Sequence, residues 1–555
     1  METVLGCLGV PYGVGGGRRE GLEDVPHVEL AVDPSRPQAL TLTLSQGERE
    51  KLPLPLEQRE KLPLPLGEGR GEGSWLGALA DALTRQEEYD TRTRDEHGRF
   101  LWAHTSQQSR ETDARPIVSE FACRVGNTLR QACLEAGVPM ARKEAWPWGK
   151  PMAACLTHDV DVVRRGKLAR GVAVRDVADA ARELSHGRLG QVASKASAIL
   201  HTAASSRDPY WTFDAISALE REHGYRSTYF FMAGRKHPED ARYDLHEPRM
   251  DGLLRSLSES GYEIALHGSY ASSDDPGMLK TLKGLLETSL GRPVSGHRNH
   301  LLRFQAPDSW LAQEAAGFAY DSTLGFSDRE GFRGGHAFPF HPFDVRDNRP
   351  LQLLEIPLAV MDATIWKYRR LRGEKAREAV STVLEQTLGV GGLATLLWHN
   401  DTFYDPEYPG VGRLYQEALE WLSAHDAHVA PCREIERWWR AREAATLSPL
   451  PEGRRGWRLE TPEEIDGLVL RVTLPDATCT PRPKTESIAT LLGAPVALPV
   501  DMPKGMSTRR ATSRRPGPCT PRAKGGSVAT VRPDGRDHLV EFGPLPAGAI
   551  ADVEF

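Results

Sequence analysis

Acidic, imidazole and guanidinium side chains follow short apolar runs in the middle of the sequence, namely Asp159, Asp161, His267, Arg298, His300 and His399. Alternate residues of a strand point the same way, so Asp159 and Asp161 could face one site at the end of a barrel strand. Two carboxylates in different environments can serve as a general base and a metal ligand. The same Asp-x-Asp spacing also occurs in turns and helix caps, so the spacing alone leaves the chemistry open.

The elements that must position these side chains alternate along the chain. Strand-like apolar runs occur at 152–163, 227–234, 261–275, 295–304, 317–326, 353–362 and 395–405. Helix-like segments between them include 251–260 and 374–388, and a charged, Ala-rich stretch follows Arg164. Strands that alternate with helices predict a parallel α/β sheet. Polar residues recur at the carboxyl ends of the strands, where a barrel places its active site.

Composition narrows the function classes. The chain has 555 residues and a formal net charge of −6, so no global basic field points to nucleic acid. No apolar run is long enough to span a bilayer. The seven cysteines are scattered without a Cys-x-x-Cys motif, and no basic residues precede the apolar stretch at the N-terminus. These features favour a reduced, cytoplasmic setting and exclude a membrane channel, a collagen-like fibre and a disulfide-rich toxin.

Two biased stretches account for part of the 52 Gly and 40 Pro residues. REKLPLPL occurs twice, at 49–56 and 59–66, and alternating Leu-Pro cannot form a helix because each proline removes a backbone donor. An extended insertion is predicted there, with a proline-rich ligand for another protein as the alternative. Residues 501–536 carry nine Lys or Arg and two Asp. Because this stretch has no aromatic residues to stack bases, it is predicted to be a solvated insertion rather than a nucleic-acid tail.

The remaining segments predict the domain organisation. Helical patterns at 74–89 and 119–137 indicate an N-terminal accessory domain, and strand-like pieces at 468–474 and 538–542 indicate a small C-terminal β-domain. The sequence DEHGRF at 95–100 predicts an exposed polar turn, because three adjacent side chains do not converge on one ion. The predicted parts are 1–47 (N-terminal part of the accessory domain), 48–74 (repeat insertion), 75–149 (helical accessory domain), 150–445 (barrel) and 446–555 (β-domain, with a basic disordered stretch at about 476–536).

The order LTHDVD, STYFF, EIALHGSY, GHRNH, YDSTLGF and LLWHN resembles the polysaccharide deacetylase superfamily, also called NodB-homology or carbohydrate esterase family four. The chain is most similar to a bacterial branch whose extra N-terminal domain contains a phrase like LTRQEEYDTRTRDEHGRF. The resemblance covers roughly residues 75–439. It implies an α/β fold, a distorted (β/α) barrel with fewer strands than the eight-stranded form, accompanied by an N-terminal α/β accessory domain.

The resemblance also implies a chemistry, the metal-assisted hydrolysis of an acetyl group on a sugar, with zinc as the usual divalent ion. It implies Asp159 as general base, Asp161 and His267 as metal ligands, Arg298 as the residue that orients the base, and His399 as general acid. Asp321 falls near the motif whose acidic residue supports the terminal histidine. Residues that could contact substrate are Ser269, Tyr270 and Asp321.

One position departs from the family pattern. The second metal histidine is expected at position 271, where this chain has Ala271. Catalytic zinc usually keeps three protein ligands, so a third must come from elsewhere. The candidates are His300, His158 and the hydroxyls of Ser269 and Ser272. Alternatively, His300 lines the pocket or packs against its rim without binding metal.

This departure keeps two function classes open. The first is a metal-dependent hydrolase that acts on a carbon–nitrogen amide bond of an acylated sugar. The second is a catalytically impaired barrel that binds carbohydrate without hydrolysing it. Retention of Asp159, Arg298 and His399 favours the enzyme, because a binding module needs no base, acid or orienting arginine. The expected partner is a carbohydrate, with no nucleic acid and no transmembrane segment, and the oligomeric state is unknown.

Overall fold

The computed structural model describes two compact units, which are treated separately below. The barrel unit comprises Ala31–Ser119 and Pro151–Glu436, and the β unit comprises Met1–Leu30, Glu120–Lys150 and Arg437–Phe555. The described residues are 29–32, 40–43, 82–91, 93–105, 115–135, 139–165, 208–234, 236–241, 243–451, 456–474, 529–534 and 537–554, with four single residues (181, 184, 185 and 192). The predicted repeat insertion at 48–74, most of the Ala-rich stretch after Arg164 and most of the basic stretch lie outside them.

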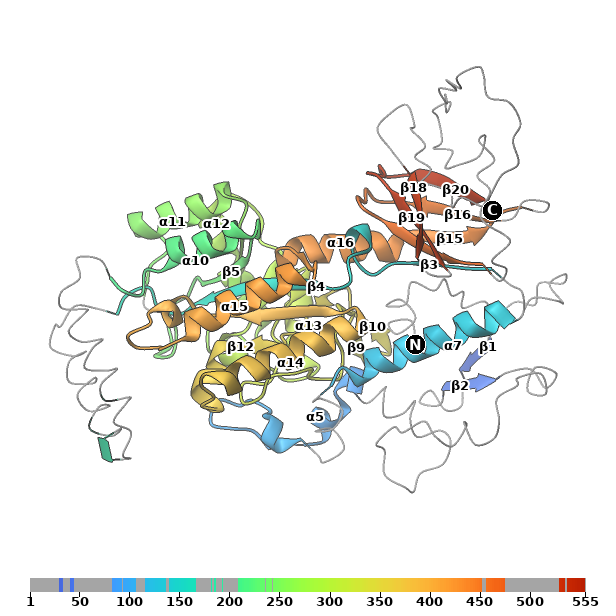
Figure 1. Ribbon diagram of the computed structural model, residues 1–555. Coiled ribbons are helices and arrows are strands. Elements are labelled where there is room, and N and C mark those ends of the chain that lie inside the picture. The colour runs from blue at the N-terminus through green and yellow to red at the C-terminus, as the bar shows by residue number, and fades with distance from the viewer. Residues whose placement is uncertain are drawn as a thin grey trace, which may run out of the picture. The chain divides into compact units, whose positions relative to one another are not determined.

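A curled parallel sheet forms the centre of the barrel unit (Figure 1). Its strands are, in spatial order, β11 (Leu354–Glu355), β8 (Tyr320–Asp321), β7 (Gly296–Arg298), β6 (Glu263–His267), β5 (Thr228–Met232), β4 (Ala153–Val160), β13 (Leu393–Leu397) and β12 (Val360–Met361), with β14 (His428–Val429) also paired to β4. All these pairs are parallel. The predicted distorted α/β barrel is confirmed. Its sheet path has eight strands rather than fewer. Three of them, β8, β11 and β12, are only two residues long and leave little pattern in the sequence.

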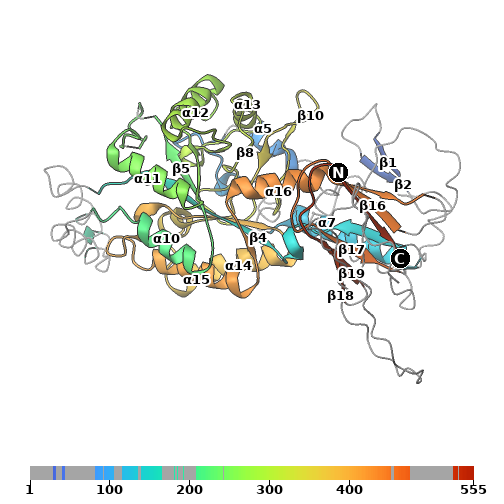
Figure 2. The ribbon, with the colours of Figure 1, turned by 90° about the horizontal axis from the view of Figure 1, so that it is seen from above.

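Amphipathic helices connect the strands and cover the sheet. They are α10 (Phe213–Glu222), α11 (Pro248–Glu259), α12 (Pro276–Leu290), α13 (Asp308–Ala315), α14 (Glu374–Val390) and α15 (Val411–Ala424). In α14 the apolar side chains recur at helical spacing and are buried, whereas Glu374 at its start is exposed. The α12 helix begins where the Asp275 carboxylate accepts the Met278 amide, and it ends at Gly291 with φ 66°. Figures 1 and 2 show α14 and α15 side by side.

The strand register brings the candidate residues to one edge of the sheet. His267, the last residue of β6, pairs with Arg298, the last residue of β7. On the other side of β4, Leu397 at the end of β13 pairs with Thr157 of β4. Because all these strands are parallel, their carboxyl ends lie together, and the polar residues that follow them face a common region.

A segment that precedes the barrel in sequence is anchored on it by a buried ion cluster. Glu88, in α5 (Gln86–Asp90), accepts the Nε of Arg85 at 2.7 Å and the Nη2 of Arg333 at 2.6 Å. All three residues are buried. Burial alone would raise the pKa of Glu88, but Arg333 and Arg85 outweigh that effect and lower it. The segment at 82–105 is therefore an integral part of the barrel unit.

Replacing Glu88 by Gln should destabilise the barrel unit strongly. The change removes the carboxylate that faces two buried guanidinium groups, and breaking a buried pair in this way costs about 3–5 kcal/mol. Urea unfolding followed by circular dichroism measures the loss, with Glu378→Gln on the outside of α14 as the control. A loss below about 1 kcal/mol, the range of surface ion pairs, would contradict this account of the anchor.

The described residues of the β unit form two antiparallel sheets. One has the order β15 (Thr446–Pro449), β16 (Gly456–Thr461) and β20 (Ala549–Glu554). The other has the order β18 (Ala529–Asp534), β19 (Asp537–Phe542), β17 (Val469–Thr473) and β3 (Met140–Lys143). The strands expected at 468–474 and 538–542 are present.

The boundary between the two units falls after Ser119, within α7 (Ile117–Glu135), a helix in the range predicted for the accessory domain (75–149). The closing helix α16 (Cys432–Ala444) also runs from one unit to the other. The remaining short strands are β1 (Glu29–Val32), β2 (Leu40–Thr43), β9 (Phe343–Asp344) and β10 (Arg349–Pro350). Among the described residues, no helix combines the length and apolar character needed to cross a membrane.

Candidate active site

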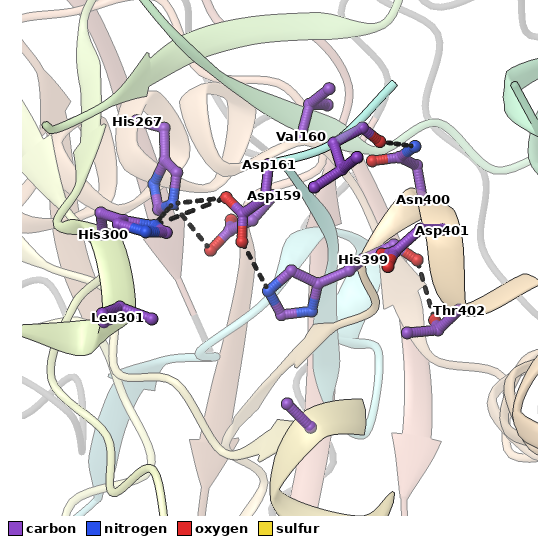
Figure 3. Close-up of polar contacts among 12 residues, drawn as sticks. Asp159, Val160, Asp161, His267, His300, Leu301, His399, Asn400, Asp401 and Thr402 are labelled. Carbon is purple, nitrogen blue, oxygen red and sulfur yellow. Dashed lines mark hydrogen bonds and ion pairs between the residues drawn. The ribbon is translucent and has the colours of Figure 1, made fainter. Parts of the chain in front are cut away.

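The central strand β4 delivers both carboxylates to the site. Asp159 is the penultimate residue of β4, and Asp161 is the first residue after the strand. Because the two are two positions apart, their side chains leave the strand on the same side. Every residue of β4 is buried, and Asp159 is only 3% exposed. Figure 3 shows both carboxylates facing His267 and His300, with His399 on the other side of Asp161.

Arg298 fixes the orientation of Asp159. Its Nη1 donates to Asp159 Oδ1 at 2.9 Å and to the hydroxyl of Thr157, also at 2.9 Å. Its Nε and Nη2 donate to the carbonyl and the hydroxyl of Ser322. The guanidinium is fully buried and lies 4.3 Å from the ring centroid of Phe230. Asp159 Oδ1 is therefore engaged, while Oδ2 lies on the side of His267, 3.6 Å from its Nε2.

Three donor atoms, one each from Asp161, His267 and His300, lie at nearly equal separations and form a donor triangle. Asp161 Oδ1 lies 3.3 Å from His267 Nε2 and 3.5 Å from His300 Nδ1, and the two ring nitrogens are 3.2 Å apart. A tetrahedral zinc site with bonds of about 2.0–2.1 Å has ligand–ligand separations of about 3.3–3.4 Å. One carboxylate oxygen and two imidazole nitrogens at these separations could hold a divalent metal ion such as zinc.

The tautomer of His267 also suits a metal ligand. Its Nδ1 lies 3.0 Å from the carbonyl oxygen of Arg298, which can only accept a hydrogen bond. Nδ1 therefore carries a proton, and Nε2 is the ring nitrogen that faces Asp161 Oδ1 and His300 Nδ1. This arrangement, in which the second nitrogen of a ligating histidine donates to a backbone carbonyl, is usual at metal sites. Asp161 Oδ1 is buried and has no hydrogen-bond partner among the described residues.

His399 is held by Asp362 rather than by Asp321. The Nδ1 of His399 lies 2.8 Å from Asp362 Oδ1, and Asp362 Oδ2 accepts the backbone amide of His399 at 2.8 Å and the hydroxyl of Thr402 at 2.7 Å. Its Nε2 lies 3.6 Å from Asp161 Oδ2. Asp161 thus lies between the two histidines of the donor triangle and His399 (Figure 3). Its Oδ1 faces His267 and its Oδ2 faces His399.

The site brings opposite charges together at the edge of the sheet, where Asp161 and His399 are partly buried. Burial alone would raise the pKa of Asp161, but His300 and His267 outweigh that effect and hold it well below its usual range. Burial alone would lower the pKa of His399, but the charges of Asp362 and Asp161 outweigh that effect and raise it well above its ordinary value. A charged carboxylate therefore faces a protonated imidazole.

Two other candidates from the sequence lie away from the donor triangle. Asp321, which falls near the motif expected to support the terminal histidine, is fully buried and lies 2.9 Å from Nδ1 of His297. It also accepts a hydrogen bond from the hydroxyl of Thr323 at 2.8 Å. Its carboxylate is therefore held between His297 of β7 and Thr323. His158, a candidate third ligand, has both ring nitrogens engaged, with the Trp398 carbonyl at 2.7 Å and Glu220 at 2.8 Å. It packs in the core instead.

Two other expected substrate contacts lie beside the site in the loop after β6. Ser269 is buried, and its hydroxyl lies 3.6 Å from the sulfur of Met278. The ring of Tyr270 is covered on both faces, by the stacked ring of His237 at 4.1 Å and by the guanidinium of Arg303 at 4.2 Å from the centroid. Two groups that close to one centroid must lie on opposite faces, so a sugar ring cannot stack on Tyr270.

Asp362 is the site residue that the sequence reasoning missed. It directly follows β12, whose Met361 pairs with Leu397 of β13, and His399 lies two residues beyond that strand. The usable signal was a carboxylate at the end of the apolar run at 353–362, the same signal that singled out Asp159 and Asp161. The sequence does not specify which strands are neighbours in the sheet. That pairing decides which carboxylate meets which histidine.

The fold and the site together define an open α/β barrel with a carboxylate–imidazole cluster at the carboxyl ends of its strands. No protein-family model matches the chain, and no curated protein matches it. Solved structures that match include polysaccharide deacetylases and members of the CE4 family.

Three of these structures illustrate the range of similarity. A protein assigned as a polysaccharide deacetylase from Mycobacterium smegmatis is 21% identical, with 56% of this chain and 98% of that chain covered and a TM-score of 0.35. An allantoinase, PuuE, is 17% identical, with 53% and 92% covered and a TM-score of 0.36. A CE4 family pseudoenzyme from Bacillus anthracis is 11% identical, with 52% and 66% covered and a TM-score of 0.28. At such values the chemistry must be inferred from the side chains of this chain.

Proposed function

We propose that the protein is a metal-dependent hydrolase that removes an acetyl group from an acylated sugar by cleaving a carbon–nitrogen amide bond. The observation that carries the proposal is the donor triangle of Asp161, His267 and His300, with Asp159 held beside it by Arg298. A zinc ion in that triangle would polarise the acetyl carbonyl and the attacking water. The three ligands would leave a fourth position for water or substrate, as catalytic zinc sites do.

Asp159 is the general base in this proposal. Its Oδ1 accepts a hydrogen bond from Arg298, which leaves Oδ2 as the proton acceptor on the side of the donor triangle. Water loses one proton to Asp159 Oδ2 as its oxygen bonds to the acetyl carbon. A base positioned in this way contributes about 10²–10⁴-fold to the rate.

His399 is the general acid. Asp362 fixes its ring, and the Nε2 proton points into the site, where Asp161 Oδ2 lies 3.6 Å away. As the carbon–nitrogen bond breaks, Nε2 gives its proton to the leaving nitrogen. The products are acetate and the free amino sugar, and the proton held by Asp159 returns to solvent or to His399.

Replacing Asp362 by Asn should slow the reaction without weakening substrate binding. An amide has one oxygen instead of two and carries no negative charge. The His399 ring therefore loses the carboxylate charge that keeps it protonated and oriented. We expect kcat to fall by about 10²-fold with little change in KM. Steady-state kinetics measures both values. A variant with unchanged kcat would remove His399 and Asp362 from the proton transfer.

The rival function is a barrel that binds carbohydrate without hydrolysing it, which Ala271 kept open in the sequence. His300 offers an imidazole that would make up for the histidine absent at 271, and this supports the hydrolase. The test is acetate release from N-acetylglucosamine oligosaccharides by the zinc-loaded protein, with Asp274→Asn on an exposed turn as the control. Release by wild type and control supports the proposal. Sugar binding without release, with zinc, cobalt or manganese added, would contradict it and leave the binding module.

A further inference from the structure

The loop that carries His300 has an unusual backbone. Leu301 and Leu302 have φ values of 57° and 54°, in the left-handed region that residues with a Cβ seldom adopt. Such conformations persist only where the surrounding structure holds them. His300 directly precedes this pair, so whatever holds the loop also determines where its imidazole lies.

Arg99 reaches this loop from a segment far away in the sequence. Its Nη1 donates to the carbonyl of Leu301 at 3.3 Å and to the hydroxyl of Tyr368 at 3.0 Å. Its Nε and Nη2 contact Asp95 Oδ2 at 2.8 and 2.7 Å. Arg99 is 5% exposed, so these contacts replace water rather than compete with it. The sequence DEHGRF was expected to form an exposed polar turn, and its Arg99 and Phe100 are instead buried.

Asp95 makes the turn rigid. Its Oδ1 accepts the backbone amides of His97 and Arg99, at 3.0 and 2.8 Å, and its own amide donates to the Arg99 carbonyl at 3.0 Å. Gly98 has φ 75°, which glycine adopts without strain. The Arg99 side chain is therefore held by its own turn, residues 95–99, before it meets the barrel.

The same turn also holds the far end of the His300 loop. Arg303 Nε donates to the carbonyl of His97 at 2.8 Å, and the Arg303 guanidinium covers the ring of Tyr270. The Tyr270 hydroxyl in turn lies 3.3 Å from His97 Nδ1. The loop is thus held at Leu301 and at Arg303 by one turn.

We propose that the turn at 95–99 is a clamp that positions His300 for metal binding, with Arg99 as its positioning residue. The inference rests on the proposed zinc site, because His300 is one of its three donors. Without Arg99 the Leu301 backbone should relax toward φ < 0, and the His300 Nδ1 would leave the donor triangle. Residues that orient ligands from outside the coordination sphere typically change metal affinity by about 10–100-fold.

Zinc affinity of the full-length protein tests the clamp. We expect Arg99→Ala to bind zinc about tenfold more weakly than wild type, measured by competition with a chromogenic chelator. Arg94→Ala is the matched control, because Arg94 lies in the same segment but donates to the carbonyls of Glu88, Thr91 and Thr93, away from the loop. Its affinity should equal that of wild type. Circular dichroism reports the folded fraction, and Asp95→Asn carries the same test should Arg99→Ala fail to fold.

A rescue variant separates positioning from general destabilisation. Glycine adopts positive φ freely, so adding Leu301→Gly to Arg99→Ala should recover at least about threefold of the lost affinity. Equal zinc affinity for wild type and Arg99→Ala, or a loss that Leu301→Gly does not reduce, would overturn the clamp while leaving the zinc site standing. A wild-type protein that binds no zinc would overturn the proposed function and the clamp with it.

Discussion

Replacing Asp159 by Asn is expected to reduce acetate release by about 10³-fold while zinc affinity stays within about twofold of wild type. The amide cannot take a proton from water, so the base is lost. It is nearly the same size as the carboxylate and retains an oxygen for Arg298 Nη1, so the buried packing around it should persist. Steady-state acetate release and a zinc titration on the same preparation measure both quantities.

The separation of the two effects is what identifies the role of Asp159. Asp274→Asn, on an exposed turn, should change neither quantity. If the Asp159→Asn variant kept more than about a tenth of the activity, another group would have to be the base. If it lost zinc instead, Asp159 would be a ligand and the donor triangle of Asp161, His267 and His300 would be incomplete.

Replacing His300 by Ala should weaken zinc binding by more than about 100-fold. A residue outside the coordination sphere already changes metal affinity by about 10–100-fold, and a direct ligand should exceed that range. Only Asp161 and His267 would then remain in the donor triangle. The measurement is a zinc titration, with acetate release falling in parallel at limiting zinc.

The control for this prediction is His425→Ala. His425 directly follows α15, where its Nδ1 lies 2.9 Å from the Trp421 carbonyl and its ring stacks on Trp421. It should bind zinc like wild type. If His300→Ala also kept its zinc affinity, His300 would be a residue that lines the pocket, which was the alternative interpretation of its place in the sequence.

The fold was predictable because its signals are local. Apolar runs such as that of β5 and helical patterns such as that of α14 specify parallel strands and covering helices without reference to partners. The number of strands on the sheet path was underestimated, because two-residue strands such as β11 and β12 leave little pattern. The burial of Arg99 was missed because it depends on Tyr368 and Leu301, which are distant in the sequence.

The candidate site was predictable where a residue ends a strand, as Asp159 and His267 do. It was not predictable where strand neighbours decide the partner. Asp321 and Asp362 both follow apolar runs, and only the pairing of β12 with β13 brings Asp362 to His399. The place of His300 beside His267 likewise depends on the left-handed backbone after it, which no local pattern of leucines indicates.

The most direct test is a crystal structure of the zinc-loaded protein, with anomalous diffraction at the zinc edge. We predict one ion bound by Asp161 Oδ1, His267 Nε2 and His300 Nδ1 at about 2.0–2.2 Å, with an open fourth position on the side of Asp159. An ion bound without His300, or no ion at this position at saturating zinc, would contradict the account.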